Sequence, residues 1–277
     1  MIETEKSRKV LQVKGLSVKV QTDEGLLPLI HHIDFDLIQG RVLGLVGESG
    51  CGKTVTCSSL LQLMDPNTVV EGSIRLNGRE LNGLAPQEMR RIRGKEIGFI
   101  MQNPMNAFTP VYTIGNQFIE TIRAHCNLSK KQAYDLAAAS LESVNLPDPS
   151  GLMKLYPFQL SGGMLQRVMI AISMCLKPSV VIADEPTTAL DVVNQLQVLR
   201  QLERLRSACG TTILLISHDL GVIAEMADEV IVMRHGRIVE HTNVFQLFDH
   251  PADPYTQSLL NARLRLPDFP VRKKTVI

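Results

Sequence analysis

The chain contains no long apolar segment. Its 277 residues include no uninterrupted hydrophobic run of the roughly 18 residues that a membrane-spanning helix requires. The first six residues read Met-Ile-Glu-Thr-Glu-Lys and lack the apolar region of a signal peptide. We therefore expect a protein that stays in the cytosol.

The sequence also lacks a charge excess and a cysteine framework. Its 29 Lys and Arg residues nearly balance 28 Asp and Glu residues, so no net field favours nucleic acid or an anionic membrane. The five cysteines are scattered, odd in number and without a Cys-x-x-Cys pair, which argues against disulfides, zinc and iron–sulfur clusters. Nucleic acid is not expected as a partner, and any anion site must be local.

Short apolar runs alternate with helix-like stretches. Because these runs are apolar on both faces, they indicate a sheet that is covered on both sides, and therefore a mainly parallel α/β core. The runs are 42–46, 98–101, 180–183, 212–216 and 230–233.

Two other regions have different patterns. Alternating residues at 10–14 and the turn-bounded segment 72–78 predict an antiparallel β layer. Between residues 103 and 174 the strand pattern disappears, and helical spacing appears at 114–126 and 130–144. This stretch predicts a helical insertion.

These patterns predict one domain over residues 1–277. Within it we expect a core with the β layer at 1–102 and 176–248, and a helical subdomain at 103–175. Prolines at 147 and 149, with Ser150 and Gly151, break the helical pattern. A looser C-terminal extension is predicted at 249–277.

One loop carries a complete phosphate-binding motif. Directly after the first core run the sequence matches G-x-x-x-x-G-K-[ST] in a strand–loop–helix context. Glycines let backbone N–H groups converge on phosphates, and the following helix adds its positive end. We expect Lys53 to reach the β- and γ-phosphates of a nucleotide and Thr54 to coordinate Mg²⁺. The expected nucleotide-binding residues are Gly47, Glu48, Ser49, Gly50, Cys51, Gly52, Lys53 and Thr54.

The alternative reading of this loop is a Gly-rich turn that caps a helix. A complete eight-residue match favours nucleotide binding instead. The loop alone does not define the reaction, because kinases, GTPases and transport ATPases share it. The predicted fold is thus a P-loop NTPase, RecA-like core.

Two carboxylates end the apolar run at 180–183, where ligands of an open α/β sheet bind. Asp184 suits the Mg²⁺ shell, and Glu185 suits the general base that activates water. The other reading is a helix N-terminus with an acidic first turn, which Pro186 would support. His218 follows a later strand and is predicted to contact the γ-phosphate; its alternative reading is a satisfied core histidine.

The segment 160–167 reads Leu-Ser-Gly-Gly-Met-Leu-Gln-Arg and resembles the signature motif of ABC ATPases. Ser161, Gly162 and Gly163 stand at the start of a predicted helix, where they offer hydrogen-bond donors and a dipole to a phosphate. The resemblance implies an ABC fold with a helical subdomain. It also implies that this segment faces the γ-phosphate bound by a second ATPase subunit in a head-to-tail dimer.

Further segments resemble motifs of that family and occur in the family's order along the chain. Gln102 resembles the Q-loop glutamine, which implies a part in catalysis and in metal binding. Asp191, in the sequence Ala-Leu-Asp, resembles the D-loop residue and implies contact with nucleotide. His218 then corresponds to the switch histidine of the family.

Within the family, residues 10–262 look like the ATP-binding subunits of oligopeptide, dipeptide and nickel importers. The tail 250–256, His-Pro-Ala-Asp-Pro-Tyr-Thr, is similar to their His-Pro-Tyr-Thr segment, and 156–167 is most similar to nickel and metal–metallophore subunits. The segments that carry the resemblance are 44–50, 101–104, 183–191 and 217–222.

This resemblance implies a peripheral protein on the cytoplasmic face of the membrane. Its expected partners are a second, non-identical ATPase subunit, two membrane permease subunits and an extracytoplasmic substrate-binding protein. Nickel, another metal chelate, dipeptides and oligopeptides all remain open as substrates. One departure concerns adenine: many members carry a stacking aromatic in the β layer, whereas this chain reads Val18-Lys19-Val20.

Two rival functions fit the sequence less well. A non-transport ABC ATPase acting in translation or DNA maintenance usually carries two cassettes or a long coiled-coil insertion, which this sequence does not contain. A P-loop kinase would need a lid and an acceptor site and would not carry the signature segment.

Overall fold

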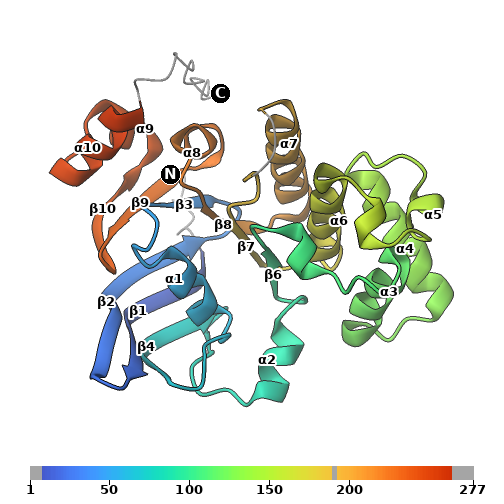
Figure 1. The fold of residues 1–277 in the computed structure, drawn as a ribbon, viewed down its shortest axis with the longest axis horizontal. Coiled ribbons are helices and arrows are strands. Elements are labelled where there is room, and N and C mark those ends of the chain that lie inside the picture. Colours follow the sequence, from blue (N-terminus) through green and yellow to red (C-terminus); the bar gives the residue numbers. More distant parts are fainter. Residues whose placement is uncertain (1–7, 189–191, 264–277) are drawn as a thin grey trace, which may run out of the picture. The chain divides into compact units, whose positions relative to one another are not determined.

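The computed structural model describes residues 8–188 and 192–263. Within these residues the chain forms two compact units (Figure 1). The first unit comprises residues 8–84 and 212–263, and the second comprises residues 85–188 and 192–211. The limits predicted for the helical subdomain, 103–175, rest on the loss of the strand pattern and stay a prediction.

An antiparallel sheet forms the first part of the first unit. Strands β1 (Lys9–Thr22), β2 (Gly25–Ile38), β4 (Thr68–Leu76) and β5 (Arg79–Glu80) lie in the order β2-β1-β4-β5. The alternation of apolar residues gives the sheet a buried face, on which Leu11, Val13 and Val18 are fully covered. The predicted antiparallel β layer is confirmed.

Four strands of the same unit belong to a second sheet. β3 (Val42–Val46) lies between β8 (Thr212–Ile216) and β9 (Glu229–Arg234) and is parallel to both, and β10 (Arg237–Asn243) pairs with β9 in antiparallel fashion. Every residue of β3 and β8 is buried, as their continuous apolar sequences predict. The helices of this unit are α1 (Lys53–Leu60), α8 (Leu220–Met226), α9 (Val244–Asp249) and α10 (Pro254–Arg263).

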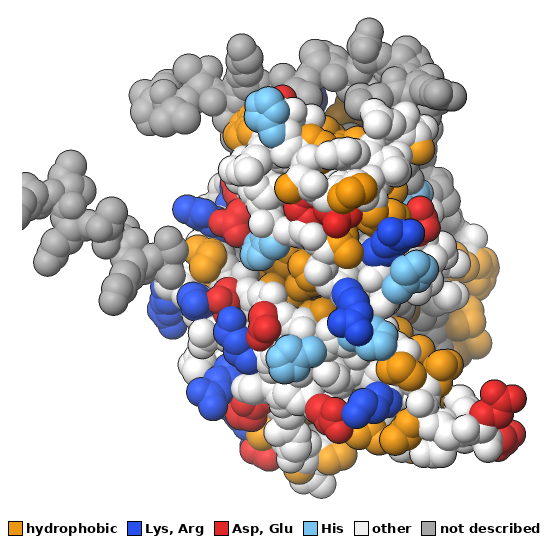
Figure 2. Space-filling view, turned by 90° about the vertical axis from the view of Figure 1, so that its left-hand side faces the viewer, with side chains coloured by type: hydrophobic (Ala, Val, Ile, Leu, Met, Phe, Trp, Pro, Cys, Tyr) orange, Lys and Arg blue, Asp and Glu red, His pale blue; other side chains and the backbone are white. Residues whose placement is uncertain are grey.

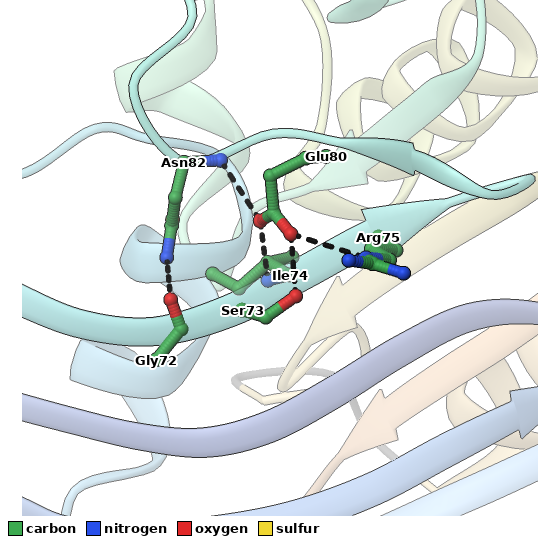
Figure 3. Close-up of polar contacts among 6 residues, drawn as sticks. All are labelled: Gly72, Ser73, Ile74, Arg75, Glu80 and Asn82. Carbon is green, nitrogen blue, oxygen red and sulfur yellow. Dashed lines mark hydrogen bonds and ion pairs between the residues drawn. The ribbon is translucent and has the colours of Figure 1, made fainter.

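The carboxylate of Glu80 stabilises the hairpin of β4 and β5 through hydrogen bonds (Figure 3). Glu80 accepts hydrogen bonds from the backbone N–H of Ile74 at 2.8 Å and of Asn82 at 3.3 Å, and it also bonds Ser73 and Arg75. Burial acts to raise the pKa of Glu80, but these hydrogen bonds outweigh it and lower that pKa below its ordinary value of 4.5. The charged form of Glu80 therefore stabilises this corner of the sheet.

On the face shown in Figure 2, acidic, basic and histidine side chains lie interspersed among apolar ones. No patch of a single sign extends across the described residues of that face. The distribution agrees with the nearly balanced charge of the sequence.

The second unit is mostly helical. Its two strands, β6 (Ile97–Ile100) and β7 (Val180–Asp184), pair in parallel. The helices are α2 (Pro86–Ile92), η1 (Pro104–Ala107), α3 (Ile114–His125), α4 (Lys130–Ser143), α5 (Pro149–Leu152), η2 (Pro157–Gln159), α6 (Gly162–Met174) and α7 (Val192–Cys209).

The two long helices predicted between residues 103 and 174 are confirmed as α3 and α4. Thr113 and Ser129 cap them, each accepting a hydrogen bond from the third residue of its helix. One detail differs: in residues 147–151, predicted only as a break, the single turn α5 begins at Pro149, because Asp148 caps it through Gly151. Among the described residues, every helix is too short or too polar to cross a membrane.

Candidate functional site

The predicted phosphate-binding loop connects β3 to α1 in the first unit. Gly47 has no room for a side chain, because a Cβ there would lie 2.6 Å from the Cys51 Sγ and against the carbonyl oxygen of Met233. Gly52 caps α1 with a φ of 111°, and a Cβ on it would lie 2.6 Å from the Ile30 Cδ1. The glycines of the motif are thus required by the close approach of neighbouring strands.

Lys53 is buried at the centre of this loop. Its Nζ donates hydrogen bonds to the carbonyl oxygens of Gly47 at 2.8 Å and Glu48 at 2.9 Å. Thr54, the next residue, is exposed in the first turn of α1. A cation at the positive end of a helix, ringed by backbone groups, is suited to bind a phosphate anion.

In the second unit, β7 ends on the two predicted carboxylates. Asp184 is 9% exposed, and Glu185 follows it with a φ of 47°, a conformation that residues other than glycine rarely adopt. The Gln102 Nε2 donates to the Glu185 Oε2 at 2.8 Å, and the Thr188 Oγ1 donates to the same oxygen at 2.9 Å. Two donors thus orient the carboxylate that is predicted to act as the base.

The alternative reading of these carboxylates as a helix N-terminus is wrong. Residues 186–188 form a turn and not the first turn of a helix. Asp184 and Gln102 carry side-chain oxygen atoms, which are the ligands that a hard cation such as Mg²⁺ prefers. Asp191, predicted to contact nucleotide, lies outside the described residues.

The signature segment lies at the start of α6, also in the second unit. Ser161 is the N-cap, and its Oγ accepts a hydrogen bond from the Met164 N–H at 3.3 Å. Ser161 and Gly162 are exposed, and Gly163 is half-buried. The first turn of α6 therefore presents N–H groups to solvent, as a helix N-terminus that binds an anion requires.

His218 belongs to the first unit and follows β8. Its side chain is exposed, so its reading as a core histidine is wrong. The residues beside it are fixed: the Ser217 Oγ accepts from the Asp219 N–H at 2.9 Å, and Asp219 caps α8 through the Gly221 N–H at 2.8 Å. The histidine thus projects from an ordered turn.

The first unit thus contains the predicted loop 47–54 and His218, and the second contains Gln102, Asp184, Glu185 and the segment 161–163. Sequence reasoning missed Thr188 as a partner of Glu185, although a threonine three residues after a carboxylate is a signal that can be read. It also missed Tyr255, whose hydroxyl accepts a hydrogen bond from the Glu48 N–H within the first unit.

Comparison with known proteins identifies the family. The family model described as ABC transporter matches residues 30–188, more than half of the chain. The chain belongs to the ABC transporter family. As a member of this family it binds ATP and couples ATP hydrolysis to transport.

Two relatives of this ABC ATPase are ATP-binding proteins of peptide transport systems. The oligopeptide transport ATP-binding protein OppD of Escherichia coli is 41% identical over 257 residues, covering 93% of this chain and 76% of OppD. The dipeptide transport ATP-binding protein DppD of Bacillus subtilis is 42% identical over 260 residues, covering 93% of this chain and 78% of DppD.

Among solved structures, the ATP-binding cassette MJ0796, described as a dimer in a post-hydrolysis state with ADP and Pi, has a TM-score of 0.76. It is 23% identical and is matched over 84% of this chain and 98% of its own. This likeness shows the fold: the ABC cassette with its antiparallel sheet and helical subdomain, as predicted.

Proposed function

We propose that this ABC ATPase hydrolyses MgATP to energise the uptake of dipeptides or oligopeptides through separate membrane permease subunits. The peptide substrate is supported by the relatives OppD and DppD, which are more than 40% identical over almost the whole chain. The hydrolytic role is supported by one observation above all, the hydrogen bond from Gln102 to Glu185 beside Asp184.

In this proposal the loop 47–54 binds the phosphates of ATP. Its backbone N–H groups face the oxygens, and the Lys53 ammonium, which two carbonyl oxygens hold in place, reaches the β- and γ-phosphates. His218 contacts the γ-phosphate and holds the attacking water in line. Asp191 contacts nucleotide, as the family pattern implies.

Asp184, Thr54 and Gln102 would hold Mg²⁺. When bound, the ion neutralises charge that develops on the departing phosphoryl group. Glu185 accepts the proton of the attacking water, and Gln102 and Thr188 keep its carboxylate oriented for that transfer.

A second ATPase subunit completes the site in this proposal. The exposed start of α6, with Ser161, Gly162 and Gly163, contacts the γ-phosphate bound by that subunit. The second subunit is proposed to be non-identical and arranged head to tail, so that ATP binding joins the subunits and hydrolysis separates them.

A cavity in the second unit suits a helix from a permease. It has a volume of about 320 Å³, and none of its lining side chains is charged; the lining includes Phe99, Met101, Phe108, Gln117, Met169 and Ile172. Met105 in η1, and Val111 and Tyr112 between η1 and α3, are exposed although they are large and hydrophobic. We propose that a short amphipathic permease segment docks there, holding the ATPase at the cytoplasmic face of the membrane.

Transport assays test the substrate. The complex of this chain with its co-purifying permeases, partner ATPase and substrate-binding protein is reconstituted in vesicles, and ATP-driven uptake of labelled dipeptide, pentapeptide and nickel is measured. The proposal predicts peptide uptake that is abolished when Glu185→Gln replaces the wild type. Nickel is a second candidate because of the segment 156–167. Uptake of nickel with none of peptide would overturn the peptide proposal.

A further inference from the structure

The C-terminal helix of the first unit bonds the phosphate-binding loop through one tyrosine. Tyr255, near the start of α10, is only 7% exposed, and its hydroxyl oxygen accepts a hydrogen bond from the Glu48 N–H at 3.1 Å. The two residues are 207 positions apart in sequence. α9 and α10 follow directly from β10 (Figure 1).

Tyr255 and Lys53 bond the same peptide group, the one between Gly47 and Glu48. The N–H of Glu48 and the carbonyl of Gly47 belong to the same planar peptide group. Tyr255 binds this group at its N–H, while the Lys53 Nζ binds it at its carbonyl oxygen at 2.8 Å. Rotation of this peptide would therefore break the Tyr255 bond and move the carbonyl against which Lys53 lies.

Tyr255 is itself held firmly. Glu240 of β10 accepts hydrogen bonds from the backbone N–H groups of Ala252 at 2.9 Å and Asp253 at 3.1 Å, and Asp253 in turn accepts from the Tyr255 N–H at 2.8 Å. The guanidinium of Arg234 lies 4.8 Å from the centre of the tyrosine ring. Burial, more than any other cause, raises the pKa of the Tyr255 phenol above its ordinary value of 10, so the hydroxyl stays neutral.

We propose that Tyr255 is a positioning residue for nucleotide binding: its hydroxyl fixes the Gly47–Glu48 peptide and thereby the place of the Lys53 ammonium. This inference rests on the proposed role of the loop 47–54 in binding phosphate. Because coupling between two sites is reciprocal, ATP bound to the loop also tightens the attachment of α10.

The test uses Tyr255→Phe, which keeps the ring and its contact with Arg234 but removes the hydroxyl. In the purified full-length chain, the dissociation constant for ATP rises about fivefold, the change expected for loss of one neutral hydrogen bond. Hydrogen exchange at the Glu48 amide becomes faster, while the melting temperature falls by less than about 4 °C. ATP protects the amides of α10 from exchange in the wild type and no longer does so in the variant.

Controls separate this effect from others. Tyr134→Phe, on α4 of the second unit, leaves the affinity for ATP unchanged. Glu240→Gln, which weakens the support of the turn before α10, changes the affinity in the same direction as Tyr255→Phe. A Tyr255→Phe protein with wild-type affinity and wild-type exchange at Glu48 would overturn the inference, as would weaker binding with unchanged Glu48 exchange.

Lys53→Ala is measured beside these variants. If Lys53→Ala binds ATP as the wild type does, the proposed phosphate site itself is wrong. If Lys53→Ala loses binding while Tyr255→Phe does not, only the role of Tyr255 is wrong.

Discussion

The phosphate-binding loop of the first unit and the carboxylates of the second are held in different ways. Backbone atoms and glycines shape the loop, and its lysine, Lys53, bonds two backbone carbonyls. Glu185, in contrast, is oriented by other side chains, those of Gln102 and Thr188. A site that backbone atoms and glycines shape tolerates few substitutions. A site that side-chain hydrogen bonds orient can be altered by removing one donor at a time.

Replacement of the predicted base should give the largest effect. Glu185→Gln keeps the size of the side chain but removes its ability to accept a proton, so ATP turnover should fall by about 10²- to 10⁴-fold while ATP binding persists. Steady-state ATPase assays and equilibrium ATP binding are measured together. Near-normal turnover in this variant would show that Glu185 is not the general base.

Removal of the lysine should affect binding first. Lys53→Ala deletes a charged donor to phosphate, and a loss of about 10- to 100-fold in ATP affinity is expected from hydrogen bonds to charged groups. Fluorescent-nucleotide titration checks this result. Arg8→Ala, at the exposed start of the described chain, is the matched control for loss of one positive charge. Equal ATP affinities in both variants and the wild type would contradict the role of Lys53 in binding phosphate.

Gln102→Ala should have a smaller effect on turnover. It removes one of the two donors to the Glu185 Oε2, and a decrease of roughly tenfold is expected while the other donor, Thr188, remains. Thr188→Val tests the second donor in the same assay. If each single variant retains full turnover and only the double variant loses it, orientation of the carboxylate is redundant.

The smallest effect concerns stability in the antiparallel sheet. Glu80→Gln should lower the free energy of unfolding by about 1 kcal/mol at neutral pH, because the side chain is partly exposed and its bonds are screened by solvent. The pKa of Glu80 is lowered on folding, so its contribution is full above the ordinary pKa of 4.5 and is lost as the pH falls through the folded value.

Urea denaturation at pH 7 and at pH 3 checks this sign. The difference between wild type and Glu80→Gln should shrink at pH 3, and Glu24→Gln, on the exposed turn between β1 and β2, should show no difference at either pH. A difference that grows on acidification would contradict the assigned cause.

Much of the fold could be predicted because local patterns determine it. The apolar runs 42–46 and 212–216 became buried strands, and Ser161, predicted at the start of a helix, became its N-cap because capping depends on a few adjacent residues. The antiparallel layer followed from the alternation at 10–14 and from the turn-bounded segment 72–78.

Other features depend on contacts between distant residues. The bond between Tyr255 and Glu48 spans 207 positions, and that between Gln102 and Glu185 spans 83, so neither follows from local periodicity. The αL backbone of Glu185 is also unpredictable, because few residues other than glycine adopt it. Motifs identified Gln102 and Glu185 individually, but only the structure shows that they bond each other.

The most direct test measures ATP binding and ATP turnover on the same preparations of Lys53→Ala and Glu185→Gln. If the loop binds the phosphates and the carboxylate performs the chemistry, Lys53→Ala loses both properties, whereas Glu185→Gln binds ATP and fails to hydrolyse it. Wild-type turnover in Glu185→Gln, or wild-type affinity in Lys53→Ala, would contradict this division of roles.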